Sequence, residues 1–299
     1  MYSILDGKLI EGDGGQVSVS VGTYSPSSPP EDPGAIPARV FASAFTHSSS
    51  HFESHESFDL ICCEPVDILK PEAVTSPVCI FMECDHMHFY AENEAVVTDA
   101  FGEMMASELS GLTPGTLLSC FLSQRLGGDR EKLEEMESSL NALEGEVLTG
   151  GTSDRYNRRF MVLRRHLVRI KRYYEQLTDL FEDLSVNENG LFDKRALKQF
   201  ALLDGRSERL MQKVIGMLDY VSDIRNAYQA ETDLRLNKTM QVLTIITVIV
   251  LPLTLIAGWY GMNLNMPEYD LPFAYPAVLI LSAAVIIACI WYFKRHKWF

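Results

Sequence analysis

The sequence predicts a membrane protein in which a cytoplasmic α/β domain and long helices precede two C-terminal transmembrane helices. Two long apolar runs, residues 240–257 and 271–293, lie near the C-terminus, and each has about the ~20 residues that a helix needs to cross a bilayer. Short strand-like runs mixed with helical patterns occupy the first 128 residues, and long charged amphipathic patterns follow them. We therefore expect an α/β domain over 1–128, a stalk or funnel of long helices over 129–238 and a transmembrane hairpin over 239–299.

The first 128 residues carry the signals of a mixed sheet with helices. Loose alternation over residues 1–20, with glycines at 12, 14 and 15, predicts a short hairpin. Short apolar runs parted by proline and aspartate predict further strands, and apolar residues at helical spacing predict helices. The predicted strands are 58–66, 78–83 and 87–91, and the predicted helices are 38–56, 93–109 and 114–124.

Three histidines fall on one face of the helix expected over 38–56. His47, His51 and His55 are spaced i, i+4, i+8, which is a spacing that could supply ligands to a divalent metal. The surrounding serines are weak helix formers, and no carboxylate or cysteine spacing completes a site. We favour a solvated face over a metal site for these residues.

Long charged helices are expected after residue 128. They cover 130–148, 153–184, a further helix after the turn at 187–190, and a last helix from about residue 207. The helix over 153–184 has a basic face, for which we favour pairing with the acidic residues 131–146 of its neighbour over binding of anionic lipid or nucleotide. The last helix meets no proline before Pro252, so it should continue into the bilayer over ~75 Å.

The formal charge of −14 is unevenly distributed. Residues 1–110 hold eighteen Asp and Glu against three Lys and Arg, a formal charge of −15. We favour an acidic solvated surface, with a cation-concentrating antechamber as the alternative. Such a chain is a poor nucleic-acid binder, because affinity there comes largely from neutralising phosphates. The six cysteines show no CxxC spacing and the N-terminus lacks a signal peptide, so we expect a reducing compartment.

The charges around the two spans predict their orientation. The loop between them contains Glu268 and Asp270 but no Lys or Arg, whereas basic residues precede the first span and follow the second. By the positive-inside rule both termini are cytoplasmic and this acidic loop faces outside. The expected location is the plasma or inner membrane, with the chain crossing it twice.

One stripe of the first span is a candidate lining for a path. Its residues are separated by 4, 3, 4, 3 and 4 positions: Met240, Thr244, Thr247, Leu251, Thr254 and Gly258. Close packing of helices and a path wetted by hydroxyl groups both explain this stripe. Two spans of one chain cannot enclose an aqueous path, so a transport role requires several copies around an axis.

The C-terminal residues resemble those of a known family. Tyr-Gly-Met-Asn at 260–263 lies at the outer end of the first span, after Asn-Lys-Thr-Met at 237–240 and Leu-Pro-Leu-Thr-Leu-Ile-Ala-Gly at 251–258. Met-Pro-Glu at 266–268 and the basic end at 294–298 follow. This pattern is similar to that of the CorA family of divalent-cation transporters, of the two-span Gly-Met-Asn type.

The resemblance implies a homopentameric channel for Mg²⁺, with Co²⁺ and Ni²⁺ as minor substrates. It implies a selectivity loop of Gly261, Met262 and Asn263, in which five Asn263 side chains select the hydrated ion. It implies a pore lined by Asn237, Met240, Leu243, Thr247, Leu251, Thr254 and Gly258. This set contains Leu243, whereas the stripe chosen by spacing contains Thr244 instead. The family also senses intracellular Mg²⁺ through aspartates between cytoplasmic domains, and we assign no residue here to those regulatory sites.

Two other functions compete with Mg²⁺ uptake. A Zn²⁺ transporter of the same superfamily is favoured slightly by histidines 47, 51, 55, 86 and 88 and disfavoured by the Met of Gly-Met-Asn. A membrane-anchored cytoplasmic sensor would need neither an oligomer nor a pore. An enzyme is not expected, because the sequence has no Gly-rich phosphate loop, no HExxH and no nucleophile motif.

Overall fold

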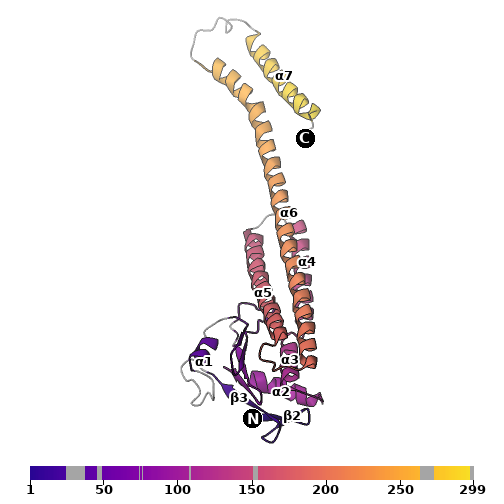
Figure 1. Ribbon diagram of the computed structural model, residues 1–299. Helices are drawn as coiled ribbons and strands as arrows, with labels where there is room; N and C mark the ends of the chain where they lie inside the picture. The colour runs from indigo at the N-terminus through magenta and orange to yellow at the C-terminus, as the bar shows by residue number, and fades with distance from the viewer. Residues whose placement is uncertain are drawn as a thin grey trace. The chain divides into compact units, whose positions relative to one another are not determined.

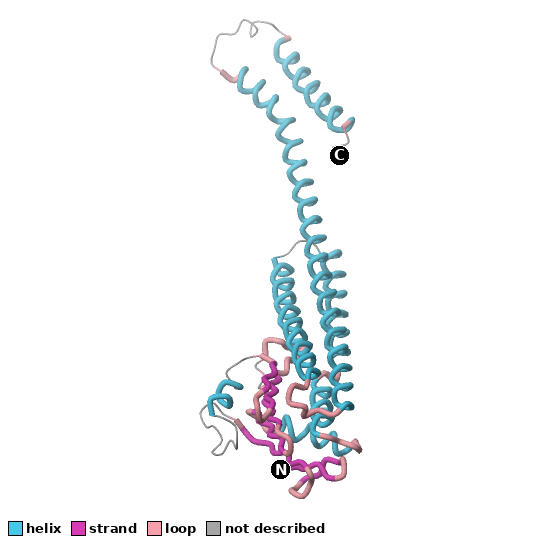
Figure 2. The backbone as a smooth tube through the Cα atoms, in the orientation of Figure 1, coloured by secondary structure: helices cyan, strands magenta, loops and turns pink. Residues whose placement is uncertain are grey.

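The structure is a computed structural model with seven strands and seven helices among the residues that it describes (Figures 1 and 2). The chain divides into two compact units, Met1–Arg225 and Asn226–Phe299. The described residues are 1–24, 38–45, 49–73, 75, 77–107, 109–150, 154–262 and 273–296.

A seven-stranded sheet organises the N-terminal part of the first unit, in the order β2-β1-β3-β7-β6-β5-β4. Strands β3 and β7 pair in parallel, and all the other neighbours are antiparallel. The turn from β1 to β2 is Asp6–Gly7, with φ of 51° and 72°, as a type I′ hairpin turn requires. The strands are β1 Tyr2–Leu5, β2 Lys8–Glu11, β3 Val17–Thr23, β4 His51–Ser54, β5 Asp59–Cys63, β6 Val78–Met82 and β7 His86–Ala91.

Aromatic side chains cover both faces of the sheet. On one face, Phe41 of helix α1 (Ala38–Ala44) packs against Phe81 and Tyr90, with ring centroids 5.6 and 4.9 Å away. On the other face, Phe89 meets a ring from helix α2 (Ala95–Ala106) and one from helix α3 (Pro114–Arg125), with centroids 5.1 and 5.3 Å away. Because both faces are covered, β5 and β6 are buried along their whole length, which explains their continuous apolar sequence.

The helix predicted over 38–56 is wrong beyond its first turns. Helix α1 ends at Ala44, and His51 begins strand β4, whose residues pair with β5 from His51 opposite Cys62 to Ser54 opposite Asp59. Pairing with the sheet therefore overrode a helical pattern in which serines are weak helix formers. The i, i+4 relation of His51 and His55 on a helix does not exist, and His47 lies outside the described residues.

Two long helices of the first unit pack beside the first part of a third. Helices α4 (Asp129–Gly150) and α5 (Asp154–Val186) match the predicted patterns, and α6 begins at Lys194. Lys213 of α6 forms ion pairs with Glu134 and Glu137 of α4, at 3.7 and 3.1 Å. These contacts attach the beginning of α6 to the helices of the same unit.

Helix α6 runs from Lys194 to Tyr260 without interruption, over 67 residues. We expected two separate helices meeting near residue 207, and this prediction is wrong. Ser207 is completely buried and donates a hydrogen bond to the carbonyl of Asp204, 2.9 Å away inside the helix, so it does not act as an N-cap. The expected continuity of this helix into the first apolar run is confirmed.

The connection between α5 and α6 is fixed to the sheet. Asn189 donates hydrogen bonds to the carbonyl of His55 at 2.6 Å and to Oδ1 of Asp59 at 2.8 Å. His55 directly follows β4 and Asp59 begins β5. The Asn189 side chain therefore connects the β4–β5 hairpin to the residues that precede α6.

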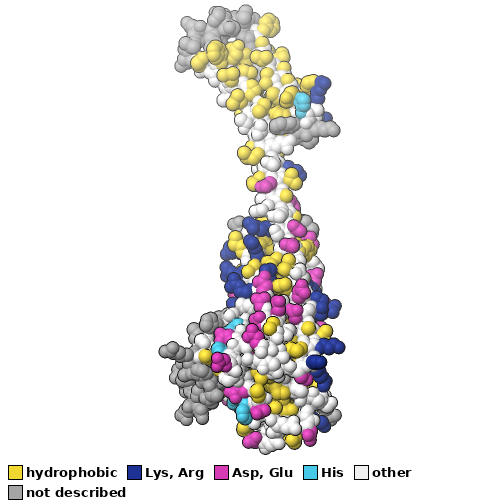
Figure 3. Space-filling view, in the orientation of Figure 1, with side chains coloured by type: hydrophobic (Ala, Val, Ile, Leu, Met, Phe, Trp, Pro, Cys, Tyr) yellow, Lys and Arg dark blue, Asp and Glu magenta, His cyan; other side chains and the backbone are white. Residues whose placement is uncertain are grey.

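The second unit contains the last part of α6 and helix α7 (Ala274–Arg295). Among the described residues, these two helices are long and apolar enough to cross a membrane. Ile245 of α6 and Phe293 of α7 are buried, whereas Leu251, Leu255 and Ile280 are more than 60% exposed. In the view of Figure 3, hydrophobic side chains gather over the apolar helices of this unit. Lipid or further copies of the chain would cover such a surface.

Candidate functional site

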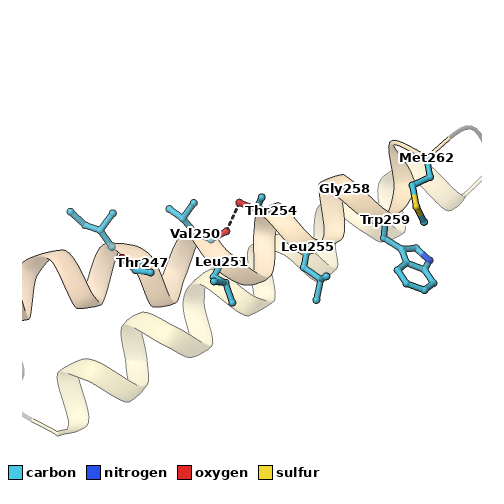
Figure 4. A pocket seen from close by; sticks show the side chains of 9 residues that line it. Thr247, Val250, Leu251, Thr254, Leu255, Gly258, Trp259 and Met262 are labelled. Atoms are coloured by element: carbon cyan, nitrogen blue, oxygen red, sulfur yellow. Dashed lines mark hydrogen bonds between the residues drawn. The ribbon is translucent and has the colours of Figure 1, made fainter.

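An open apolar groove of about 780 Å³ runs along one side of α6 in the second unit (Figure 4). All the residues that line it belong to α6 except Met262, which lies two residues after the end of the helix. They are Ile246, Thr247, Val250, Leu251, Thr254, Leu255, Gly258, Trp259 and Met262.

The groove brings together the C-terminal half of the predicted pore lining. Thr247, Leu251, Thr254 and Gly258 all line it, at intervals of 4, 3 and 4 residues. The remaining predicted residues, Asn237, Met240 and Leu243, are exposed on earlier turns of α6 and do not line the groove. All seven predicted pore residues are exposed, with no other described part of the chain covering them.

A different stripe of α6 is less exposed. Gln241, Ile245, Ile249, Pro252 and Ile256 are buried or half-buried, and their spacing places them together on one face of the helix. Figure 1 shows α7 beside this end of α6, and α7 carries a matching stripe that ends in the buried Phe293. Packing of α7 on one face therefore leaves the groove face free for other partners.

The threonines of the first span all hydrogen bond to their own helix. The hydroxyls of Thr244, Thr247 and Thr254 donate to the carbonyls four residues earlier, at 2.8, 2.9 and 3.0 Å. Each hydroxyl proton is thus engaged, and the oxygen keeps lone pairs that can accept a hydrogen bond. Such oxygens suit a path for hydrated cations, and they also satisfy the packing alternative.

Helix α6 ends where the Gly-Met-Asn sequence begins. The amide of Gly261 donates to the carbonyl of Ala257 at 2.9 Å. A Cβ atom added at Gly261 would lie 2.9 Å from that same oxygen, so glycine permits this close helix end. Met262 lines the groove, whereas Asn263, Glu268 and Asp270 lie outside the described residues.

Four groove residues lie outside both the stripe chosen by spacing and the loop implied by the resemblance. Ile246, Val250, Leu255 and Trp259 flank the predicted stripe and complete the wall of the groove. The predicted stripe takes one residue on each turn of the helix. The groove is lined by two adjacent residues on most turns, so a wider sector of the helix would have included them.

Histidines do not form a second site in the described part of the chain. Nε2 of His55 lies 3.2 Å from Glu53, and Nε2 of His51 lies 3.9 Å from the same carboxylate. Among the described residues, no group of three or more His, Cys, Asp or Glu could hold a metal ion. Of the three predicted histidines, His51 and His55 are described. Both lie near Glu53 of β4, and neither is part of a helix.

An α/β domain that continues through long helices into two apolar C-terminal helices defines a membrane protein with a large N-terminal part outside the bilayer. The chain belongs to the family described as "CorA-like Mg2+ transporter protein", which matches residues 42–295.

Curated relatives agree with this family. The chain is 31% identical over 167 residues to the "Cobalt/magnesium transport protein CorA" of Thermotoga maritima, covering 56% of this chain and 47% of the relative. It is 33% identical over 138 residues to the "Putative metal ion transporter YfjQ" of Bacillus subtilis, covering 46% and 43%. The matches thus span about half the length of these relatives.

Solved structures share the fold. The complete structure of the CorA magnesium transporter from Methanocaldococcus jannaschii has a TM-score of 0.74 at 18% identity, covering 87% of this chain and 84% of that chain. The cytoplasmic domain of ZntB from Vibrio parahaemolyticus has a TM-score of 0.55 at 14% identity, covering 67% and 80%. The predicted fold class is confirmed by these likenesses.

Proposed function

We propose that this chain is a Mg²⁺ transporter or channel that mediates Mg²⁺ uptake through a homopentameric pore, with Co²⁺ and Ni²⁺ as minor substrates. The observation that carries the proposal is the exposed stripe of Thr247, Leu251, Thr254 and Gly258 on α6, which leads to Gly261 in a member of this family. One copy leaves this stripe open, so several copies around an axis are needed to enclose a path.

In this proposal Asn263 forms the outer ring that selects the ion. Mg²⁺ gives up its water reluctantly, so neutral amide oxygens can bind the hydrated ion, whereas five carboxylates would hold it too strongly. Glu268 and Asp270 in the same loop would raise the local concentration of cations without touching the bare ion.

Deeper in the proposed pore, the character of the lining changes. Thr254 would form a ring of oxygen acceptors and Gly258 would leave carbonyls accessible. Leu251, Leu243 and Met240 would form an apolar constriction that closes by dewetting, with Asn237 at its cytoplasmic end. No charged residue interrupts either apolar run, which favours passive movement driven by the membrane potential over a proton relay.

A matched pair of asparagines tests the selective ring. In liposomes containing the full chain, Asn263→Ala should abolish Mg²⁺ uptake measured with an entrapped Mg²⁺ dye. Asn265→Ala, two residues further in the same loop, should leave uptake near the wild-type rate, and both variants should give the wild-type oligomer in mild detergent. Normal uptake by Asn263→Ala would refute the assignment of this residue.

The same assay separates the competing functions. A Zn²⁺ transporter remains the nearest alternative because the fold likeness includes a ZntB cytoplasmic domain. Flux of Zn²⁺ that Mg²⁺ does not inhibit would favour that alternative. A wild-type chain that is monomeric in mild detergent and carries no cation would favour the membrane-anchored sensor. The proposed location is the plasma or inner membrane, with both termini in the cytoplasm.

A further inference from the structure

The outer face of α5 is an arginine-rich surface, which we call the arginine face. Met161 is 65% exposed and Val168 is 44% exposed between the arginines. In Figure 3, Lys and Arg side chains gather over α5 with hydrophobic atoms among them. The exposed residues of this face are Arg158, Met161, Val162, Arg164, Arg165, Val168, Arg169 and Arg172.

Most of these arginines do not pair with the neighbouring helix, contrary to our favoured expectation. Arg159 of α5 forms an ion pair with Glu146 of α4 at 2.5 Å. Acidic residues of α4 instead meet Lys213 of α6. Within the described ranges, four exposed arginines take part in no ion pair, namely Arg158, Arg164, Arg169 and Arg172.

The composition of the arginine face is that of an interface. Residues 155–172 contain seven arginines and one lysine, and arginine is the cation suited to fixed pairing with carboxylates. Arginine and methionine are enriched at protein interfaces, whereas lysine is depleted. Grooves of about 590 and 400 Å³ lie on either side of the face, and the second contains Met161, Arg164 and Val168.

The chain itself contains a surface of opposite charge. Residues 1–110 carry the formal charge of −15, and Lys8 and Lys70 are the described lysines among them. Arg165 and His166 of α5 already lie 3.6 and 3.5 Å from Glu72 of this acidic domain. Exposed carboxylates remain on Asp6, Glu11, Asp13, Glu56, Asp67, Asp85, Asp99 and Glu103.

We propose that the arginine face of α5 docks on the acidic α/β domain of a neighbouring copy of this chain. The inference rests on the homo-oligomer of the proposed function and adds the surface through which its soluble parts associate. Charge complementarity would set the register of the contact, while Met161 and Val168 would contribute the apolar area that paired charges lack.

Site-specific photocrosslinking tests the docking in the full-length oligomer. A photoreactive amino acid at Arg164 or Arg169 is combined with copies carrying heavy nitrogen, so that mass spectrometry separates crosslinks between copies from those within one. We expect crosslinks between copies to peptides from residues 1–107, and none from the same probe at Glu135, which is exposed on α4. Crosslinks only within one chain, only to lipid, or absent would overturn the proposal.

Charge reversal provides a measurement that does not depend on a probe. Arg164→Glu together with Arg169→Glu should weaken the oligomer by about tenfold or more, the effect of losing ~1.4 kcal/mol. Arg130→Glu is the control, because Arg130 pairs within α4 with Glu134 at 3.1 Å. Raising salt from about 0.1 to about 1 M shortens the screening length from about 10 to about 3 Å, and should weaken the wild type more than the double variant.

The two proposals fail separately in these experiments. A wild-type oligomer that conducts Mg²⁺ but gives no crosslinks to the acidic domain would overturn the docking surface alone. An unchanged oligomer in the double variant would do the same. A monomeric wild type without flux would overturn the proposed function itself.

Discussion

The hydroxyl of Thr254 donates a hydrogen bond to the backbone carbonyl of Val250, 3.0 Å away on the preceding turn of α6 (Figure 4). Both residues line the groove. Because its proton is held by the helix, Thr254 offers only an acceptor to the groove, and an acceptor orients the water shell of a cation correctly. The side chain therefore has chemistry suited to the proposed path as well as to helix packing.

Replacement of Thr254 by valine should lower Mg²⁺ flux by about tenfold, equivalent to ~1.4 kcal/mol in the barrier. Valine keeps the shape but removes the acceptor oxygen from every copy in the ring. Thr254→Ser, which keeps the oxygen, should stay near the wild-type rate in the same liposome assay. Equal flux in the valine and serine variants would mean that Thr254 serves packing only.

Leu251 lies three residues before Thr254, lines the groove and is 66% exposed. If its ring closes the pore by excluding water, a polar side chain of similar size should keep the path wet. Leu251→Asn should therefore raise the basal cation flux about tenfold, and Leu251→Met should not. Patch recording on reconstituted bilayers measures the basal conductance, and a silent asparagine variant with normal assembly would contradict the constriction.

Gly261 closes α6 with so little room that a methyl group would meet the Ala257 carbonyl at 2.9 Å. Gly261→Ala should displace the loop that begins there and reduce Mg²⁺ flux severalfold while the oligomer persists. Gly216→Ala in the same helix is the matched control, since nothing lies within 4 Å of its added Cβ, and alanine favours a helix by about 1 kcal/mol. Wild-type flux in Gly261→Ala would show that the loop tolerates the shift.

The burial of Asp59 at the start of β5 should make stability depend on pH. Burial raises the pKa of Asp59 above its ordinary value, although Ser54 and Asn189 donate hydrogen bonds to Oδ1. Oδ2 has no hydrogen-bond partner among the described residues, and nearby Glu188 also raises the pKa. The native state thus binds this proton more tightly than the unfolded chain does.

Stability from this group is complete below the unfolded pKa of about 4 and is lost as pH rises through the raised native pKa. The melting temperature of the full chain in mild detergent should therefore fall through this residue as the pH rises above about 4. The asparagine of Asp59→Asn does not titrate, so the melting temperature of this variant should fall less over the same pH range. The expected difference is about 2–4 °C for each kcal/mol that protonation of Asp59 contributes to stability. An unchanged slope in the variant would show that other groups cause it.

Much of the fold could be predicted from local patterns in the sequence. The apolar runs of β5 and β6 and the helix predicted over 114–124 were found because their signals are local. Thr113 caps this helix, because its side chain accepts a hydrogen bond from the amide of Thr116. Residues 51–54 were misassigned because the partner that makes them a strand, β5, contributes its hydrogen bonds only in the folded sheet. The break expected near Ser207 failed for a similar reason, since this serine is buried against Thr178 of α5 at 2.9 Å.

Within the candidate site, the sequence by itself determined the residues that repeat along the first span, from Met240 to Gly258, because helical spacing needs no partner to be read. It also determined the helix that carries them without a break from the first unit into the second. Tertiary structure alone decided which stripe of that helix stays open, because burial depends on where α7 packs and not on the spacing of α6. It likewise decided that Arg164 and Arg169 remain without an ion pair among the described residues, whereas two of the carboxylates of α4, Glu134 and Glu137, pair with Lys213 on another helix.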